Sequence, residues 1–230
     1  MSIGAVFEDA FRIYRRLFAR SVVVAGLVFA VVGLGEALAA RRATALVTLV
    51  SLLLGLVGGL LVQGALVLAV RDLHERRPAE PTRELVDRTR ERLGTLLGAS
   101  LLYGFGVAVG VVLLLVVPGL IALARWALIV PLVVIERRGW RDAFARSNEL
   151  VRGQTGRVLV LVVVANLLTG VVSFGIGSLF SFLPTFAATW LGGTVAGALT
   201  VPYQAQVLTV LYYRLTEPDR AMLPPAAQAR

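Results

Sequence analysis

Long stretches without a charged residue constrain this chain more than any other feature. Residues 43–70, 93–124 and 158–213 contain no Asp, Glu, Lys or Arg, and they are 28, 32 and 56 residues long. The apolar core of a bilayer is about 30 Å thick and needs roughly 20 apolar residues per helix. A soluble fold of this size could not hide so many apolar side chains. The sequence therefore predicts an all-α integral membrane protein.

Six spans fit into the uncharged stretches. The predicted spans occupy 21–40, 43–70, two segments of 93–135 separated by a tight turn at Pro118–Gly119, and two segments of 158–213. A remainder at 178–190 is rich in Phe and contains Pro184 and Trp190. Aromatic rings favour the membrane interface, so these residues are expected to form a short interfacial helix, with a re-entrant segment as the alternative.

The composition agrees with a membrane protein. Hydrophobic residues make up 57% of the chain and charged residues 16%. Soluble domains average about 45–50% and about 25%.

The positions of Arg predict the orientation. The net charge is +9, and all 23 basic residues are Arg, of which 20 lie in 1–20, 71–92, 137–157 and 214–230. Six spans place these four segments on one side, and the excess of positive charge makes that side the cytoplasm. The absence of Lys suggests a GC-rich coding sequence, so we expect a bacterial inner membrane. Because the Arg residues lie between apolar runs, they indicate topology and contact with anionic lipid headgroups, and no nucleic acid.

One alternative concerns the first span. Ala37-Leu38-Ala39 is similar to a signal-peptidase site, but the amphipathic stretch of 20 residues before the apolar run is long for a signal peptide.

Three amphipathic segments precede the odd-numbered spans and predict a repeat. Each has an apolar stripe at helical spacing and an acid four residues before an Arg. These pairs are Glu8 and Arg12, Glu84 and Arg88, and Asp142 and Arg146. The prediction is one membrane domain over 1–216, a pseudo-threefold repeat of helix, span and span with units at about 1–75, 81–138 and 139–216, and a disordered cytoplasmic tail at 217–230. The three helices should lie in the cytoplasmic leaflet, where they orient the spans, gather anionic lipid or dock a membrane-protein partner.

Polar side chains inside the predicted spans are the candidate functional residues. An ionisable group in a span costs about 2.5–3.5 kcal/mol on insertion scales, so it needs a partner or water. The candidate polar centre comprises Arg125, Gln63, Asn166, Gln204, Gln206 and Glu36. It could bind an anionic headgroup through Arg125, or its members could join the helices by hydrogen bonds. Pro131 and Pro202 also lie within spans, where they should kink or unwind the helix.

Signatures of catalysis are missing. The chain has no Cys, one His (His74, expected in a charged loop), and no H-E-x-x-H, Walker A or G-x-S-x-G motif. We therefore expect no catalytic, cofactor or metal site, and a protein that is not an enzyme.

A set of positions in the second half resembles a known family. These positions are Pro118, Arg125, Pro131, Glu136, Gly139, Arg146, Ser147, Pro202, Tyr212 and Arg214. Their pattern resembles the membrane domain of some bacterial glycerophosphoryl diester phosphodiesterases, which also occurs alone. In those enzymes a separate soluble barrel carries out the reaction, and these 230 residues do not include it. The activity is therefore not carried over, and the resemblance implies a multi-span helical fold while leaving its role open.

The sequence favours a non-enzymatic inner-membrane protein that interacts with lipids in an organising or accessory role. The alternative is a small transporter or channel for an anionic or amphipathic solute, with a pathway lined by Arg125, Gln63, Asn166 and Gln204. A lipid-modifying enzyme is a third reading, for which no nucleophile, base or metal ligand is evident.

Overall fold

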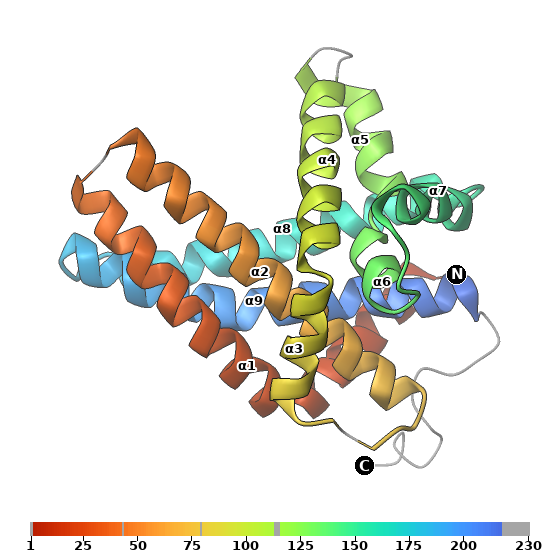
Figure 1. Ribbon diagram of the computed structural model, residues 1–230, viewed down its shortest axis with the longest axis horizontal. Helices are drawn as coiled ribbons and strands as arrows, with labels where there is room; N and C mark the ends of the chain where they lie inside the picture. Colours follow the sequence, from red (N-terminus) through yellow and green to blue (C-terminus); the bar gives the residue numbers. More distant parts are fainter. Residues whose placement is uncertain (1, 43, 79, 113–115, 218–230) are drawn as a thin grey trace.

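The computed structural model describes residues 2–42, 44–78, 80–112 and 116–217, and among these residues it contains helices and no strand (Figure 1). In chain order the helices are α1 (Ile3–Arg42), α2 (Ala45–His74), α3 (Thr82–Glu91), α4 (Leu93–Val112), α5 (Val116–Arg125), α6 (Ile129–Val134), α7 (Trp140–Val151), α8 (Thr155–Leu179) and α9 (Thr185–Thr216). The predicted all-α fold is confirmed for this part of the chain. The predicted tail at 218–230 lies outside the described residues.

Five segments of the described chain are long and apolar enough to cross a membrane. They are Ile3–Ala39, Ala45–His74, Leu93–Gly110, Val117–Val134 and Thr155–Leu179. Helix α9 has 32 residues but falls outside this set, because it is less apolar than α8 and includes Gln204 and Gln206. The described chain is thus all-helical with five candidate spans, as expected of a membrane protein, and the sixth span stays a prediction.

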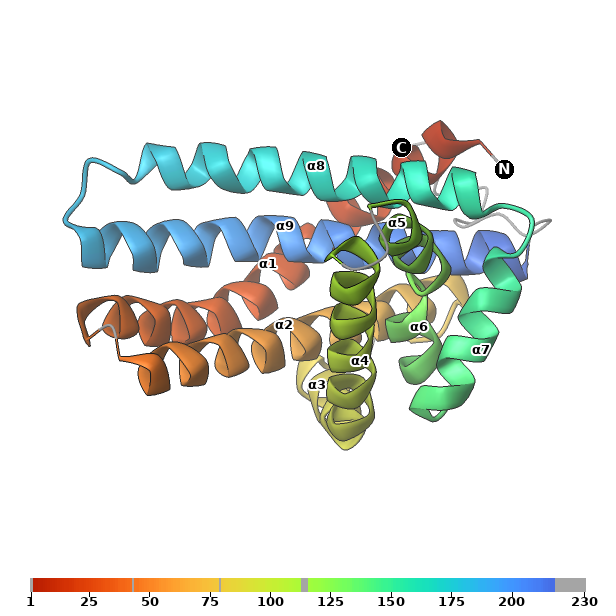
Figure 2. The same cartoon turned by 90° about the horizontal axis from the view of Figure 1, so that it is seen from above.

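Four helices run along the long axis of the molecule. Figure 2 shows α1, α2, α8 and α9 extending in this direction, with the α4–α5 hairpin crossing them steeply. Helix α9 packs against both α1 and α8, and α4 packs against α5. The main core lies where α2, α6 and α9 meet, and it includes the fully buried side chains of Val67, Leu132 and Leu211.

The predicted turn at Pro118–Gly119 is wrong. Both residues lie within the first turn of α5, where proline is tolerated because that N–H has no intrahelical partner. Gly119 instead serves helix packing, since a methyl group added at Gly110 of α4 would lie 2.7 Å from the Gly119 Cα atom. The residues that connect α4 to α5, 113–115, lie outside the described part.

The predicted fourth span is not one continuous helix. Helix α5 ends at Arg125 and α6 begins at Ile129, with a turn at 126–128 between them. Pro131 accounts for the break, because it has no N–H to donate to the carbonyl of Ala127 and its ring crowds that carbonyl. Pro202 has a milder effect, since α9 continues through it.

The predicted interfacial helix at 178–190 is also wrong. Helix α8 continues to Leu179, a turn follows, and α9 begins at Thr185 after Pro184. Trp190 does not anchor a separate helix at the interface. Its indole N–H donates to the carbonyl oxygen of Ala30 in α1 at 2.9 Å, so the aromatic residue joins two long helices.

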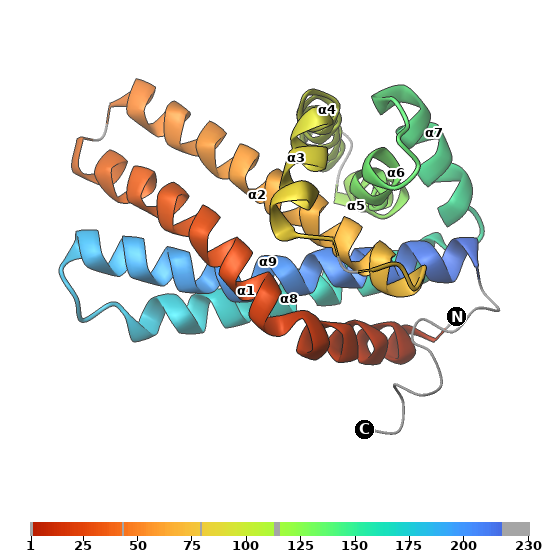
Figure 3. The ribbon, with the colours of Figure 1, turned by 60° about the horizontal axis from the view of Figure 1, so that its bottom comes forward.

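The amphipathic segments differ from the prediction in what they contact. The first is the beginning of α1, which changes direction in Figure 3 without ending, whereas α3 and α7 are separate helices. Their apolar stripes pack into the protein core, as the burial of Leu85 in α3 and Ala143 in α7 indicates. Part of each stripe therefore stabilises the bundle, while Phe11, Phe18 and Trp140 stay exposed.

The charges on these helices pair differently from the expected spacing. Arg12 lies 4.0 Å from Glu8, as predicted. Arg88 instead pairs with Glu80 at 3.0 Å, and Arg146 with Glu149 at 2.7 Å. The threefold repeat stays a prediction.

Candidate functional site

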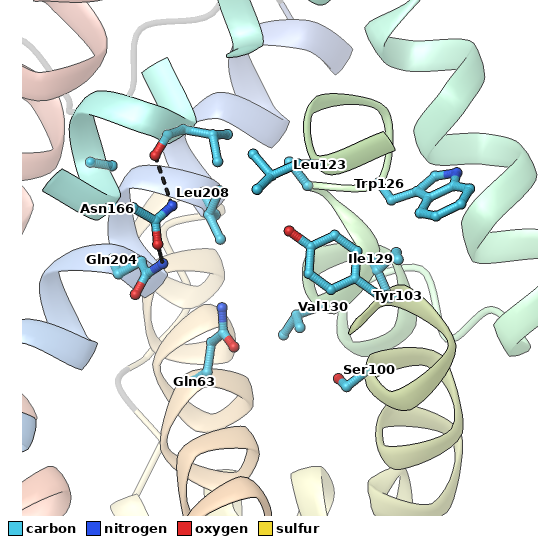
Figure 4. Close-up of a pocket in the computed structure, with 13 residues that line it drawn as sticks. Gln63, Ser100, Tyr103, Leu123, Trp126, Ile129, Val130, Asn166, Gln204 and Leu208 are labelled. Atoms are coloured by element: carbon cyan, nitrogen blue, oxygen red, sulfur yellow. Dashed lines mark hydrogen bonds between the residues drawn. The ribbon is translucent and has the colours of Figure 1, made fainter. Parts of the chain in front are cut away.

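A polar pocket lies where α2, α4, α8 and α9 meet the turn between α5 and α6. Its volume is about 250 Å³. Its lining comes from α2, α4, α5, α6, α8, α9 and the turn between α5 and α6, and Figure 4 shows how these side chains lie. The polar members of the lining are Gln63, Ser100, Tyr103, Trp126, Asn166 and Gln204, and the others are apolar. The described lining contains no charged side chain, so the pocket favours an uncharged polar group.

Two amides in the pocket hold each other in place. Gln204 donates from Nε2 to Oδ1 of Asn166 at 3.1 Å, and Asn166 donates from Nδ2 to the carbonyl oxygen of Val162 at 2.8 Å (Figure 4). Gln63, Ser100 and Tyr103 make no side-chain hydrogen bond to any described residue. The pocket therefore combines a fixed amide pair with three hydrogen-bonding side chains that are available to a ligand.

An apolar groove lies next to the pocket, between α5 and α8. It is about 570 Å³ in volume. Its lining comes from α5 and α8: Leu123, Val163, Asn166, Leu167, Gly170, Val171 and Phe174. Leu123 and Asn166 belong to both the pocket and the groove. Phe174 is 78% exposed, which opens the groove on the surface of α8. The polar pocket therefore has an apolar, surface-open groove beside it.

Three of the six residues of the predicted polar centre line this pocket, and three do not. Gln63, Asn166 and Gln204 come together as expected from their depths. Gln206 cannot join them, because residues two apart on a helix point in nearly opposite directions. It is fully buried, and its amide has no hydrogen-bond partner among the described residues.

The two charged members also lie elsewhere. Arg125, the last residue of α5, is exposed and does not line the pocket. Glu36 lies in α1 beside Gly55 of α2 and is exposed as well. The expected convergence of Arg125 with the amides is therefore wrong, since the side chain lies on the outer face of its helix.

Sequence reasoning missed three polar residues of the pocket. Ser100 and Tyr103 lie three positions apart on α4, so they share one helix face. Trp126 belongs to the turn that interrupts the predicted fourth span. A search for polar groups sharing a face of an apolar helix would have identified the first two.

A second polar cluster lies at the end of the bundle where α1 begins and α2 and α9 end. We name it the charged end, and it consists of Asp9, Arg71, Asp72, His74 and Arg214. Asp9 pairs with Arg12 and Arg214, and Arg71 with Asp72 at 3.2 Å. Asp9, Arg71, Asp72 and His74 are all buried.

The predicted location of His74 was wrong. His74 is the last residue of α2, and it is 4% exposed. Its Nε2 atom lies 3.2 Å from Oε2 of Glu217, and its ring centroid lies 4.0 Å from that of Tyr213. Both partners come from the end of the chain's last helix, so the burial could not be read from the local charge pattern.

Several positions of the family resemblance meet beside the charged end. The Tyr212 hydroxyl donates to Oε1 of Glu136 at 3.0 Å. Ser147 of α7 donates to the Arg125 carbonyl oxygen at 2.7 Å and accepts the Leu128 N–H at 3.4 Å. The two bonds of Ser147 satisfy backbone groups left unpaired by the break between α5 and α6.

Other positions of the resemblance also have structural partners. Gly139 is the N-cap residue of α7, and Pro131 is buried in α6. The hydrogen bond from Arg146 to Glu149 raises the pKa of Arg146 above its ordinary value. The bonds of Ser147 connect α7 to the break between α5 and α6, and the bond of Tyr212 connects α9 to Glu136 after α6.

Among the described residues, no group of three or more His, Asp or Glu side chains is placed to hold a metal ion. The chain matches no protein-family model, no curated protein and no solved structure.

Proposed function

We propose that this chain is a non-enzymatic bacterial inner-membrane protein that binds a lipid. The polar pocket would hold an uncharged part of the head or its ester groups, and the groove between α5 and α8 would hold an acyl chain. The observation that carries this proposal is that the two spaces are adjacent and share Leu123 and Asn166 in their linings. A polar pocket beside an apolar groove matches the chemistry of an amphipathic molecule.

The membrane placement rests on six spans with both chain ends in the cytoplasm. Helix α9 has no charged residue from 185 to 213 and, at 32 residues, is about 48 Å long. It packs against α1 and α8, both of which carry candidate spans, so it lies at the same depth. Six spans also leave the Arg-rich segments on one side.

The position of the groove supports lipid as the ligand. Leu167, Val171 and Phe174 line it and are 62%, 68% and 78% exposed. On a membrane helix such side chains are in contact with acyl chains, so a lipid reaches the groove without crossing water. The three side chains available in the pocket can then bond its hydroxyl or carbonyl oxygens. This differs from the anionic headgroup expected from Arg125, which lies outside the pocket.

We also propose that the chain belongs to the family it resembles, the membrane domain of bacterial glycerophosphoryl diester phosphodiesterases. The contacts of Glu136, Ser147 and Tyr212 support a structural role for those positions. Such a role suits an organising or accessory membrane protein.

A transporter for an amphipathic solute is the second candidate. The interrupted helix at 126–128 favours it, because transporters often form their substrate sites where a span is broken. Trp126 in that break lines the pocket. A transport pathway would need water to reach Gln63, whereas a lipid site would exclude water from it.

Native mass spectrometry of the gently extracted protein tests lipid binding. A side chain added at Gly170 or at Gly175 would meet no atom within 4 Å, and only Gly170 lines the groove. We expect the wild type and Gly175→Leu to retain one lipid and Gly170→Leu to lose it. Equal retention by all three proteins, or a wild type without lipid, would overturn the proposal.

Cysteine labelling separates the two candidates. Because the chain has no Cys, Gln63→Cys introduces a single thiol. Protection of this thiol from a membrane-impermeant maleimide supports the lipid site. Rapid labelling from either side of the membrane supports a transport pathway.

A further inference from the structure

A second groove, between α1 and α3, is separate from the site described above. It is about 670 Å³ in volume. Its lining consists of Ala19, Arg20, Val23, Val24, Leu27, Val28, Thr82, Arg83 and Val86. None of these residues lines the polar pocket or the groove beside α8. Two arginines and a threonine therefore accompany an otherwise apolar lining.

The arginines of this groove are not paired with any acidic side chain among the described residues. Arg20 donates from Nε to Oγ1 of Thr82 at 3.2 Å and from Nη2 to the carbonyl oxygen of Glu80, so the start of α3 holds its guanidinium in place. The Glu80 carboxylate pairs with Arg88 at 3.0 Å. Neither Arg20 nor Arg83 forms an ion pair with a described residue. Two uncompensated cations at one groove favour an anion.

The position of Arg20 along α1 relates the anion to the membrane. Arg20 is the last charged residue before the uncharged run from Ser21 to Gly35. Leu27 follows it by seven residues, or about 10 Å along the helix. Val23 and Leu27 are 60% and 69% exposed. The groove thus passes from a cationic end into an apolar face that faces acyl chains.

Helix α3 adds a smaller contribution at the same end. It begins at Thr82 without a side-chain cap, and its first-turn N–H groups carry partial positive charge.

We propose that the groove between α1 and α3 binds an anionic phospholipid, with its phosphodiester at Arg20 and Arg83 and an acyl chain along Val23 and Leu27. This inference rests on the proposed membrane placement of α1. It does not require the lipid site beside α8, which contains no cation and would select a different part of a lipid. The exposed apolar wall identifies the occupant as a lipid, because a free phosphate would leave that wall uncovered.

Lipid titration of the full chain by native mass spectrometry tests the proposal. Phosphatidylglycerol is the anionic probe and phosphatidylcholine the zwitterionic one. The test variant is Arg20→Gln with Arg83→Gln. The control, Arg16→Gln with Arg90→Gln, removes the same charge from exposed positions on the same two helices outside the groove.

We expect the wild type and the control to bind phosphatidylglycerol more tightly than phosphatidylcholine, and the test variant to lose about tenfold in affinity for phosphatidylglycerol. An equal loss in the control would mean that binding is diffuse electrostatic attraction, and would overturn the site. Full competition by inorganic phosphate would overturn the lipid as the occupant.

Two further variants serve as controls. Arg83→Gln alone leaves the contacts of Arg20 with α3 intact, so it should fold and still lose part of the affinity; unchanged affinity would contradict the proposal. Gly170→Leu should bind phosphatidylglycerol in this groove as the wild type does. A failed lipid test at Gly170 together with a positive result here would overturn only the function proposed above.

Discussion

Asp9 and Arg214, which lie 205 positions apart, form an ion pair that connects the first helix to the last. The Asp9 side chain is 6% exposed and also pairs with Arg12. The buried Asp9 carboxylate thus lies between two guanidinium groups. Removing its charge is costly because both cations would lose their partner. Helices α1 and α9 are therefore held together at the charged end.

Replacing Asp9 should reveal this connection. Asp9→Asn should lower the free energy of unfolding by about 1–3 kcal/mol, since Arg12 and Arg214 lose their common partner. Thermal unfolding in detergent measures the change. Glu8→Gln is the control, because Glu8 is exposed and only 4.0 Å from Arg12, and its effect should stay below about 0.5 kcal/mol. Equal effects of the two variants would contradict the prediction.

Ser147 should stabilise the break between α5 and α6. Ser147→Ala removes the bonds to the Arg125 carbonyl and the Leu128 N–H, and should cost about 1–3 kcal/mol. Hydrogen exchange at residues 126–129 should become faster than in the wild type. The neighbouring Asn148 is exposed, so Asn148→Ala should leave exchange unchanged. Unchanged exchange in Ser147→Ala would show that the hydroxyl is dispensable there.

Gly110 should be intolerant of any side chain. Its substitution by Ala would place Cβ 2.7 Å from the Gly119 Cα atom, where only a backbone shift could relieve the contact. We expect a loss of about 1–3 kcal/mol in unfolding free energy. Gly104 lies on the same helix, and a Cβ atom there meets nothing within 4 Å. Gly104→Ala should therefore be neutral or slightly stabilising, and a comparable loss in both variants would disprove the close approach.

The hydroxyl of Tyr212 should contribute to stability through Glu136. Tyr212→Phe keeps the ring but removes the 3.0 Å bond, and should lower the unfolding free energy by about 1.5–3 kcal/mol because the acceptor is a carboxylate. Tyr203→Phe is a suitable control, since the Tyr203 ring packs on Tyr14 and its hydroxyl makes no hydrogen bond to a described residue. Chemical denaturation measures the free energy of unfolding of the two variants. Equal destabilisation of the Tyr203 and Tyr212 variants would argue against this role of the Tyr212 hydroxyl.

The proposed topology can be tested by labelling single cysteines in intact cells with an impermeant reagent. Thr44 is the N-cap residue of α2 and Ser181 lies in the turn after α8, whereas Arg76 follows the other end of α2; all three are exposed. We expect Thr44→Cys and Ser181→Cys to be labelled, and Arg76→Cys to be protected until the membrane is permeabilised. A cysteine added after Arg230 should be protected as well. Labelling of that last cysteine would mean that α9 does not cross the membrane.

Local composition was sufficient to predict much of the helical architecture. The uncharged run at 43–70 corresponds to α2, and the run at 158–213 corresponds to α8 and α9. Such helices can be predicted from sequence because a span is defined by the apolarity and the length of a single segment. Gln63, Asn166 and Gln204 could be recognised as candidates in the same way, because a polar amide within an apolar run is evident from the neighbouring residues alone. Turn positions were less predictable. Proline at position 118 is compatible with a turn and with the start of a helix. In the structure it lies in the first turn of α5, which packs against α4.

What the sequence determined by itself is a helical membrane protein and a short set of polar residues at similar depths. Only the tertiary structure decided which of these residues meet. Helix rotation about the long axis places Gln204 in the pocket, Gln206 in the core and Arg125 on the surface, and that rotation depends on all packed neighbours at once. The burial of His74 and the pairing of Asp9 with Arg214 have the same origin. Such contacts join residues distant in the chain, so no local pattern of charge or hydropathy specifies them.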